Sequence, residues 1–430
     1  MTLPIPTEGE TALALETARV EPDGTPPEFN PLFSKWLLFA LPLAMFGLIA
    51  GYLGGLSVLL PLQAEHIAGA TGKVALLGAA SGVGALVAAV TNPIIGWLSD
   101  HTRFRLGKRN TWVLIGSIGL VVAFSLIGHA NSVVAVVAGW GVVQLFLTAQ
   151  QAPLSATVAD RVPIHRLGFV SGLIGAVTTA SALAGVAIAA LVPSIQSSYY
   201  ILGGIVLVTG CVFAFTTKDV PAAARQPRIS RADRVRVVVS RDFVWAWIGR
   251  FLVLLGQGAA SLYLLYILQD YLHYSKIAPG QTAAQGVLFI TMITSICSIA
   301  SSFFFGWLSD KLKRRRIFVA ISSVLVAGPY LLMAFFPSFP LFVVVAVLSG
   351  LGIGAFYAVD QALAVSVLPR KENAGTYLGI LVIAGTLGQV LSPTIAAVSV
   401  GISGYPALFV VAAVVSILGA VSVTLIRSVR

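Results

Sequence analysis

Residues 96–110 read GWLSDHTRFRLGKRN, and the first five of them, Gly96 to Asp100, recur unchanged as Gly306 to Asp310. Each copy stands at the end of a long apolar run, and a cluster of basic residues follows each copy. Two identical pentapeptides at equivalent places so far apart indicate that the chain contains two copies of one structural unit.

The chain around these copies is apolar enough to lie in a membrane. Hydrophobic residues make up 57% of its 430 residues, charged residues make up only 10%, and the mean hydropathy is +0.93. An ordinary soluble domain is about 25% charged, and a helix needs roughly 20 apolar residues to cross the hydrocarbon. The composition therefore predicts an all-α polytopic membrane protein with twelve transmembrane helices, near residues 36–60, 74–99, 111–129, 132–158, 168–193, 198–216, 243–270, 284–309, 316–336, 340–367, 374–399 and 404–426.

Basic residues fall almost entirely in alternate connections between these runs. Of the 27 lysines and arginines, only Lys73 and Lys276 lie in the opposite connections, and Arg250 lies within a run. Cytoplasmic connections carry the excess of basic residues in membrane proteins. Both termini and the connection 217–242 are therefore predicted to be cytoplasmic, in a multi-pass protein of the plasma membrane.

The same pattern divides the chain into four regions. Residues 1–35 are acidic and lack both a long apolar run and the features of a cleaved secretory signal, so they are predicted to be a disordered tail. One six-helix bundle at 36–216 and a second at 243–430 flank the basic linker 217–242. Two parallel six-helix repeats joined in this way describe the Major Facilitator architecture.

The motifs carry a more specific resemblance. The stretch from Gly96 to Asn110 resembles the signature of the Major Facilitator Superfamily, in the form seen in glycoside-pentoside-hexuronide:cation symporters and related sucrose transporters. The stretch from Asp360 through Pro369 to Gly379 is similar to the same branch. The resemblance implies import of a sugar or glycoside with a cation. The fifth run, 168–193, lacks the glycine-proline signature of many drug/proton antiporters, which disfavours export.

The connection after the repeated pentapeptide is predicted to act as a gate. Gly96 is expected to let two helices approach closely, and Asp100 is expected to bind neighbouring cations and hold helix ends together in one conformation only. For the arginines, an equally open alternative is that they fix the topology and bind anionic headgroups. The second copy lacks the later Gly-Lys-Arg and is degenerate. The predicted gate residues are Gly96, Asp100, Arg103, Arg105, Gly107, Lys108, Arg109, Gly306 and Asp310.

Polar residues of the fourth run share one helical face. Trp140, Gln144, Thr148 and Gln151 follow one another at steps of three or four residues. Polar side chains cost free energy against lipid, so this stripe is expected to line a substrate cavity, where Trp140 can stack on a sugar ring. The alternative is hydrogen bonding between helices.

Arg250 and Asp360 are the only formal charges well inside the predicted hydrocarbon. Each lies eight residues from the cytoplasmic end of its run, so their depths match, and we expect them to meet across the second half of the cavity. Asp360 is the candidate for proton coupling; a static ion pair is the alternative. The other predicted cavity residues lie on the same two apolar runs: Gln257, Tyr357 and Gln361. Tyr357 and Gln361 follow a glycine-rich stretch, Gly350–Gly354, which is expected to be flexible.

The chain shows no sign of an enzyme. It has no nucleotide-binding signature, and its two cysteines lie inside apolar runs, which excludes a disulfide framework. No cofactor and no metal are expected. The expected partners are a small-molecule substrate, H⁺ or another cation, and the lipid bilayer, with no nucleic acid and with a monomer as the functional unit.

These observations favour a secondary active transporter that moves a small solute by alternating access, with a sugar or glycoside and H⁺ as the favoured substrates. Two alternatives stay open at this point. One is an exporter of a hydrophobic metabolite or drug, and the other is a membrane sensor or assembly partner that does not transport.

Overall fold

The computed structural model describes residues 34–163, 166–219, 241–312, 315–366 and 374–426. The described residues are helical except for short connections and contain no strand. The elements are α2 (Lys35–Gly54), the π-helix η1 (Gly55–Leu59), α3 (Leu60–His101), α4 (Asn110–Gly128), α5 (Val133–Arg161), α6 (Leu167–Leu191), α7 (Ile195–Thr216), α9 (Arg241–Leu262), α10 (Leu264–Tyr266), the π-helix η3 (Ile267–Tyr271), α11 (Tyr274–Ile277), α12 (Ala283–Leu312), α13 (Arg315–Phe335), α14 (Phe339–Ser366) and α15 (Ala374–Thr424).

Ten of the described helical stretches are long and apolar enough to span a membrane. Two of them are broken inside: the stretch Lys35–His101 at Gly69, which has φ 66° and ψ −174°, and α15 at Ser403 and Gly404, the latter with φ 73°. Glycine adopts positive φ without steric cost, so the chain reverses direction there within a few residues. The connection expected between the first two runs is thus not a loop, because helix continues on both sides of Gly69.

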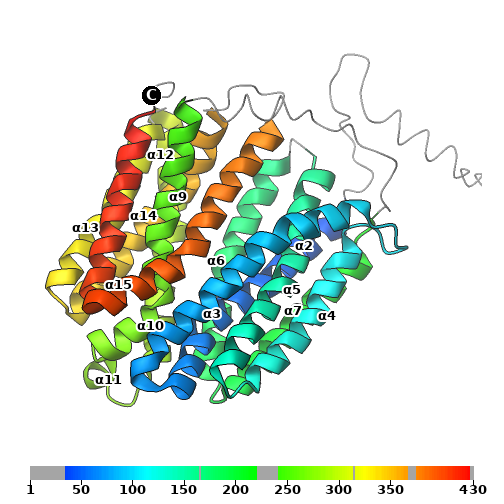
Figure 1. The fold of residues 1–430 in the computed structure, drawn as a ribbon. Helices are drawn as coiled ribbons and strands as arrows, with labels where there is room; N and C mark the ends of the chain where they lie inside the picture. Colours follow the sequence, from blue (N-terminus) through cyan, green and yellow to red (C-terminus); the bar gives the residue numbers. More distant parts are fainter. Residues whose placement is uncertain (1–33, 164–165, 220–240, 313–314, 367–373, 427–430) are drawn as a thin grey trace, which may run out of the picture.

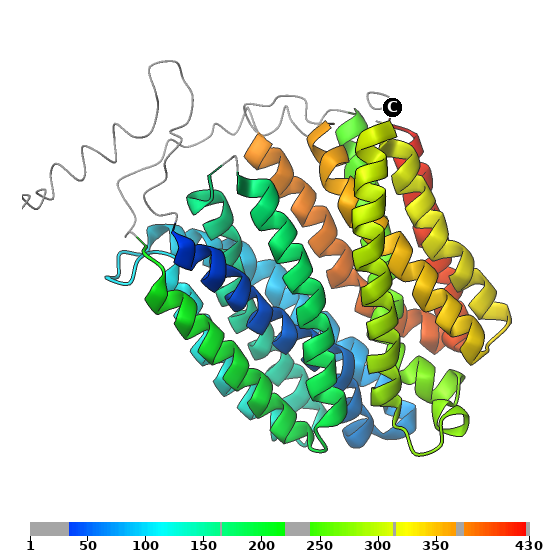
Figure 2. The ribbon, with the colours of Figure 1, turned by 180° about the vertical axis from the view of Figure 1, so that it is seen from behind.

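The helices form two groups that lie side by side in both views (Figure 1; Figure 2). Helices α2 to α7 make the first group, and α9 to α15 make the second (Figure 1). The groups contact each other through α3 with α15 and through α6 with α12. We call the end where α3 finishes and α4 begins the basic end, and the opposite end, which includes Gly69 and α11, the far end.

Glycines bring several helices of one group into close contact. A Cβ at Gly185 of α6 would collide with the backbone of Ala50 in α2, and a Cβ at Gly354 of α14 would collide with the backbone of Ser298 in α12. The stretch Gly350–Gly354, expected to be flexible, instead lies inside the continuous helix α14. Its glycines serve close packing, because helices in lipid associate through small residues.

Large apolar side chains cover the outside of the helices. Leu86, Val134, Val208 and Phe303 are among those more than half exposed. A soluble protein rarely exposes so much apolar surface, whereas hydrocarbon around the molecule would cover it. Interior positions are filled by a core cluster that draws residues from both groups.

Candidate functional site

Arg109 is the centre of a charge network at the basic end. Its guanidinium forms ion pairs with Asp100 at the end of α3 and with Asp160 near the end of α5, the latter at 2.9 Å. It also donates a hydrogen bond to Ser99 Oγ. Lys108 joins the network through Asp160 at 3.4 Å. One cation thus holds the ends of α3 and α5 together with the start of α4.

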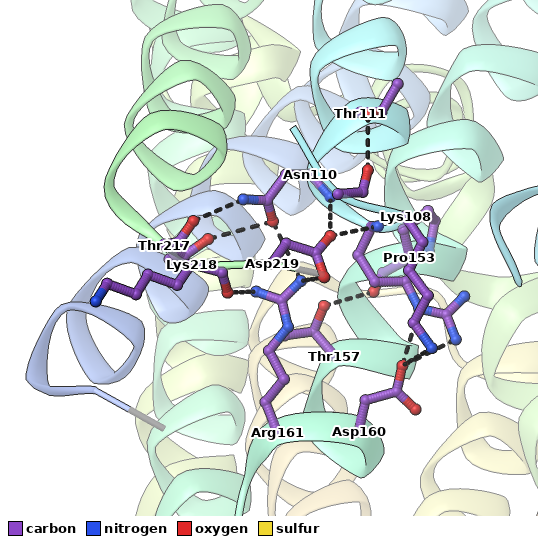
Figure 3. A network of polar contacts seen from close by, with 12 residues as sticks. Lys108, Asn110, Thr111, Pro153, Thr157, Asp160, Arg161, Thr217, Lys218 and Asp219 are labelled. Atoms are coloured by element: carbon purple, nitrogen blue, oxygen red, sulfur yellow. Dashed lines mark hydrogen bonds and ion pairs between the residues drawn. The ribbon is translucent and has the colours of Figure 1, made fainter. Parts of the chain in front are cut away.

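A second ion pair lies beside it and is more deeply buried. Arg161 Nη2 and Asp219 Oδ1 are 2.8 Å apart, and their side chains are 0% and 1% exposed. Burial lowers the pKa of the Arg161 guanidinium from its ordinary value, and the charge of Asp219 opposes this shift. Arg161 also donates a hydrogen bond to Oδ1 of Asn110. The side-chain nitrogen of Asn110 in turn donates to the carbonyl oxygens of Ala214 and Thr217 (Figure 3).

Asp219 caps the beginning of α4. Its Oδ2 accepts hydrogen bonds from the backbone N–H groups of Arg109, at 2.6 Å, and Asn110, at 3.0 Å (Figure 3). A carboxylate at a helix N-terminus satisfies unpaired N–H groups and interacts favourably with the helix dipole. Asp219, the third residue after the end of α7, therefore fixes the position of α4.

Gly107 makes room for this cap. Its φ of 93° is a conformation that other residues rarely adopt, and an added Cβ would lie 2.3 Å from Cβ of Asp219. Both the backbone conformation and the neighbour therefore require glycine at this position.

The other predicted gate residues are placed differently. Arg103 and Arg105 are exposed and form no ion pair among the contacts that the structure describes. Among the described residues, a Cβ at Gly96 would have no neighbour within 4 Å, and one at Gly306 would make only an ordinary contact with Ala358. The described residues thus show no close helix approach at Gly96. The side chain of Asp310 lies outside the described residues.

Sequence reasoning missed four members of this network: Asn110, Asp160, Arg161 and Asp219. Asp160 and Arg161 follow the fourth apolar run, and Asp219 is one of three aspartates in the predominantly basic connection 217–242. Acidic residues contribute little to topology, which is the signal that could have identified the two aspartates.

The second candidate site lies between α9 and α14. Arg250 Nη1 and Asp360 Oδ2 are 3.1 Å apart, so the expected meeting of the two charges is present. The side chains are 12% and 9% exposed, and the Nε of Arg250 is buried without a hydrogen-bond partner among the described residues. Tyr357, one helical turn before Asp360, is 46% exposed, and Gln257 is half-buried. The side chain of Gln361 lies outside the described residues.

The polar stripe of α5 faces α3 over most of its length. Trp140 was expected to line a cavity, yet it is fully buried, and its ring fills the space beside Gly55 and Gly84. Thr148 is 4% exposed and shares a 2.8 Å hydrogen bond with Thr91 of α3. Packing against α3 explains why Trp140 and Thr148 are buried. Gln144 is also buried, next to Gly84, and only Gln151 is exposed.

The described residues include no group of three or more His, Cys, Asp or Glu side chains arranged to hold a metal ion. Both sites consist of paired charges. Such pairs can form in one arrangement of helices and separate in another, and this gives them a use in conformational change.

The sequence matches a family of known proteins over most of its length. The model of the Major Facilitator Superfamily matches residues 44–294 and 246–430. An uncharacterized MFS-type transporter, C18.02, of Schizosaccharomyces pombe is 28% identical over 126 residues. That stretch is 29% of this chain and spans only 28% of the relative's length.

Solved structures share the fold at low sequence identity. A variant of the nucleoside transporter NupG has a TM-score of 0.73 at 13% identity, with 91% of this chain and 99% of that chain covered. A variant of the peptide transporter POT has a TM-score of 0.70 at 13% identity, with 90% and 93% covered. A bacterial homolog of the human lysosomal transporter Spinster, in an inward-facing and unoccupied conformation, has 0.65 at 14%, with 92% and 95% covered.

The two-group helical fold and the family match over both groups lead to the same assignment: the chain belongs to the Major Facilitator Superfamily.

Proposed function

We propose that the protein is a secondary active transporter that takes up a small solute by alternating access, with a sugar or glycoside as the solute and H⁺ as the coupling ion. The observation that carries the proposal is the ion pair between Arg250 and Asp360, two ionisable groups that belong to apolar helices of one group. An ionisable pair within apolar helices is costly, and in transporters it typically marks an ion or substrate pathway.

The chemistry of the neighbouring side chains suits a hydroxylated solute. The Nε–H of Arg250 has no hydrogen-bond partner among the described residues, and Tyr357 and Gln257 keep exposed surface on the same two helices. An amide, a phenol and a guanidinium together offer hydrogen-bond donors and acceptors to the hydroxyl groups of a sugar. Proton binding to Asp360 would weaken its pair with Arg250 and so couple the proton to the position of α9 relative to α14.

The proposal also includes the orientation of the protein in the membrane. With 24 basic residues in the connections at the basic end and at the termini, we propose that this end faces the cytoplasm in the plasma membrane. The functional unit in this proposal is a monomer. The far end then faces outward.

A ligand screen followed by a transport assay tests the function. Purified protein is heated with sugars and glycosides, with nucleosides and peptides, and with lipophilic cations; a ligand at 100 times its Kd stabilises by about 2.7 kcal/mol. The class that raises the melting temperature is then assayed for uptake into proteoliposomes, with and without an imposed pH gradient. The proposal expects a sugar or glycoside and gradient-dependent uptake.

Other outcomes overturn separate parts of the proposal. Stabilisation by another class alone rejects the sugar. An uptake rate that is the same with and without the pH gradient rejects proton coupling. Accumulation of lipophilic cations on the opposite side supports an exporter, and the absence of any flux in protein that is folded and binds ligand supports a sensor.

A further inference from the structure

Lys73 makes a set of contacts at the far end that the proposed function does not use. Its ammonium group lies 2.9 Å from Asp270 Oδ1, 3.1 Å from Glu65 Oε1 and 3.4 Å from Gln269 Oε1. It also lies 4.7 Å from the centre of the Tyr266 ring. Although it is a lysine in one of the few basic positions at this end, it is only 2% exposed.

The partners of Lys73 come from both helical groups. Glu65 lies on α3, as Lys73 does, whereas Tyr266, Gln269 and Asp270 belong to α10 and η3 of the second group. Gln269 in turn donates to both carboxylate oxygens of Glu65, at 2.8 and 2.9 Å. We call Glu65, Lys73, Gln269 and Asp270 the far-end cluster.

Asp270 and Lys73 would retain different partners if the two helical groups separated. Asp270 accepts a 2.7 Å hydrogen bond from Tyr405 of its own group, so it stays paired if the groups separate. Lys73 would keep only Glu65. A buried cation that loses most of its partners is costly unless water reaches it. The cluster is thus stable when it is closed and dry, or open and hydrated.

The backbone beside the cluster departs from a regular helix on both sides. The helical path that begins with α9 is interrupted at Tyr263, where φ is −94° and ψ is 11°, and continues through the π-helix η3 that carries Asp270. On the opposite side, α3 is broken at Gly69. π-Helical turns occur frequently at functional sites, and such breaks let a helix end move without disturbing the rest of the helix.

Tight packing lies directly below the polar contacts. A Cβ added at Gly78 of α3 would lie 2.6 Å from Cβ of Ala397 in α15, and one added at Gly82 would lie 3.3 Å from Oγ1 of Thr394. The hydroxyl group of Tyr263 donates to the carbonyl oxygen of Val74 at 3.2 Å. The first turns of α3 after Gly69 are therefore held against the second group by both polar and steric contacts.

We propose that the far-end cluster is a gate, in which Lys73 holds the two helical groups together and must release Asp270 once in each transport cycle. The inference rests on the proposed function, because a gate has a role only in alternating access. It assigns to Lys73 the control of which side of the membrane the central residues face.

Sided labelling of one cysteine tests the gate without any substrate. Thr394→Cys is introduced into a protein with Cys211→Ala and Cys297→Ala, because Thr394 is exposed and lies beside Gly82 below the cluster. The rate of reaction with an impermeant thiol reagent is then measured from the outside in cells and from the basic end in inside-out vesicles. Lys73→Met and Asp270→Asn should each raise the outside rate by about fivefold or more and lower the rate from the basic end, since coupling energies between conformations are typically of this size.

Lys276→Met is the matched control. Lys276 is the other basic residue of the far-end connections, is exposed, and has no ion pair among the described contacts, so its loss changes the net charge equally. The rates in this variant should equal those of the parent. The double variant Lys73→Met with Asp270→Asn should behave like either single variant, since each single change already breaks the ion pair between Lys73 and Asp270 that joins the two groups.

Three results would overturn the gate. They are outside rates in Lys73→Met and Asp270→Asn equal to the control, rates that rise from both sides, which indicate a loosened structure, and additive effects in the double variant. If Lys73→Met fails to fold, Asp270→Asn, which removes only a charge, carries the test. Failure of the proposed function is distinguishable, because it appears as absent uptake while the labelling still shifts.

Discussion

Arg250 and Asp360 meet at 3.1 Å although more than a hundred residues separate them in the chain, and each lies on a predominantly apolar helix. Two isolated charges at these positions would each carry a desolvation cost that the pair offsets in part. The pair joins α9 to α14 within the second group, so a change of charge at either residue acts on the packing of those two helices.

We expect removal of one partner to harm transport more than removal of both. Asp360→Asn and Arg250→Gln each leave an uncompensated partner, whereas the double variant leaves none. Proton-driven uptake should be lost in Asp360→Asn while substrate counterflow, which needs no net proton movement, continues. Uptake and counterflow are measured side by side in proteoliposomes containing each of the three variants.

Two results would contradict this prediction. Proton-driven accumulation by Asp360→Asn at the parent level removes the coupling role. Losses that simply add in the double variant show that the two side chains act independently.

Asp100→Asn should slow transport and leave binding intact. The asparagine keeps the size and the hydrogen-bonding capacity of Asp100 but weakens the contact that Arg109 makes with the end of α3. We expect an uptake rate reduced about fivefold or more, with an unchanged Kd, as a shift of conformational equilibrium produces. Arg103→Gln, which alters an exposed neighbour with no described ion pair, is the control. A parent uptake rate in Asp100→Asn would leave only a topological role for this residue.

Gly107→Ala should destabilise the protein, whereas Gly96→Ala should not. The first change places a side chain at φ 93° against Asp219, which costs at least about 1–2 kcal/mol for the backbone alone. The second adds a methyl group within a helix, at a place where no described atom outside that helix's local backbone lies within 4 Å. Thermal unfolding of both variants in the same detergent measures the difference. Equal melting temperatures would show that the cap at Asp219 is not maintained in solution.

Arg161→Met should be among the most destabilising single changes in the chain. It removes the 2.8 Å ion pair with the 1%-exposed carboxylate of Asp219, and breaking a buried pair in this way costs about 3–5 kcal/mol. Asp219→Asn should cost less, because its amide oxygen can still accept the N–H groups of Arg109 and Asn110. Unfolding experiments on both variants and on the double variant check the order; a larger loss in Asp219→Asn would assign the energy to the helix cap.

Single cysteines test the proposed sidedness. In the background without Cys211 and Cys297, Ser275→Cys in α11 should react with an impermeant reagent in intact cells, and Lys311→Cys near the end of α12 should react only after the membrane is opened. Reaction of both in intact cells would refute the proposed topology.

The helices could be predicted from the sequence because hydrocarbon imposes a simple constraint on length and composition. The ion pair of Arg250 and Asp360 could be predicted for the same reason, since charge inside an apolar run is conspicuous and depth can be counted along a helix. Asp100 and Arg109 were also identified, because an acidic residue in a basic connection calls for an explanation other than topology.

Contacts between distant connections could not be predicted. Nothing in the local sequence shows that Asp219 reaches Gly107, or that Lys73 reaches Asp270, because each contact depends on how helices far apart in the chain are placed. Trp140 illustrates a different limit. Its periodicity fixes the face on which it lies, but whether that face meets a cavity or α3 depends on the glycines opposite it.

The connection that contains α11 is an epitope at the far end that an antibody fragment could recognise. The other described connections there are short: 129–132, 192–194, 336–338 and the two breaks at Gly69 and Gly404. α11 begins only four residues after Asp270. The affinity of a binder that recognises its exposed residues Ser275 to Ile277 would therefore depend on whether η3 contacts α3. Selecting such binders on the parent and on Asp270→Asn would yield reagents that each trap one state for structure determination.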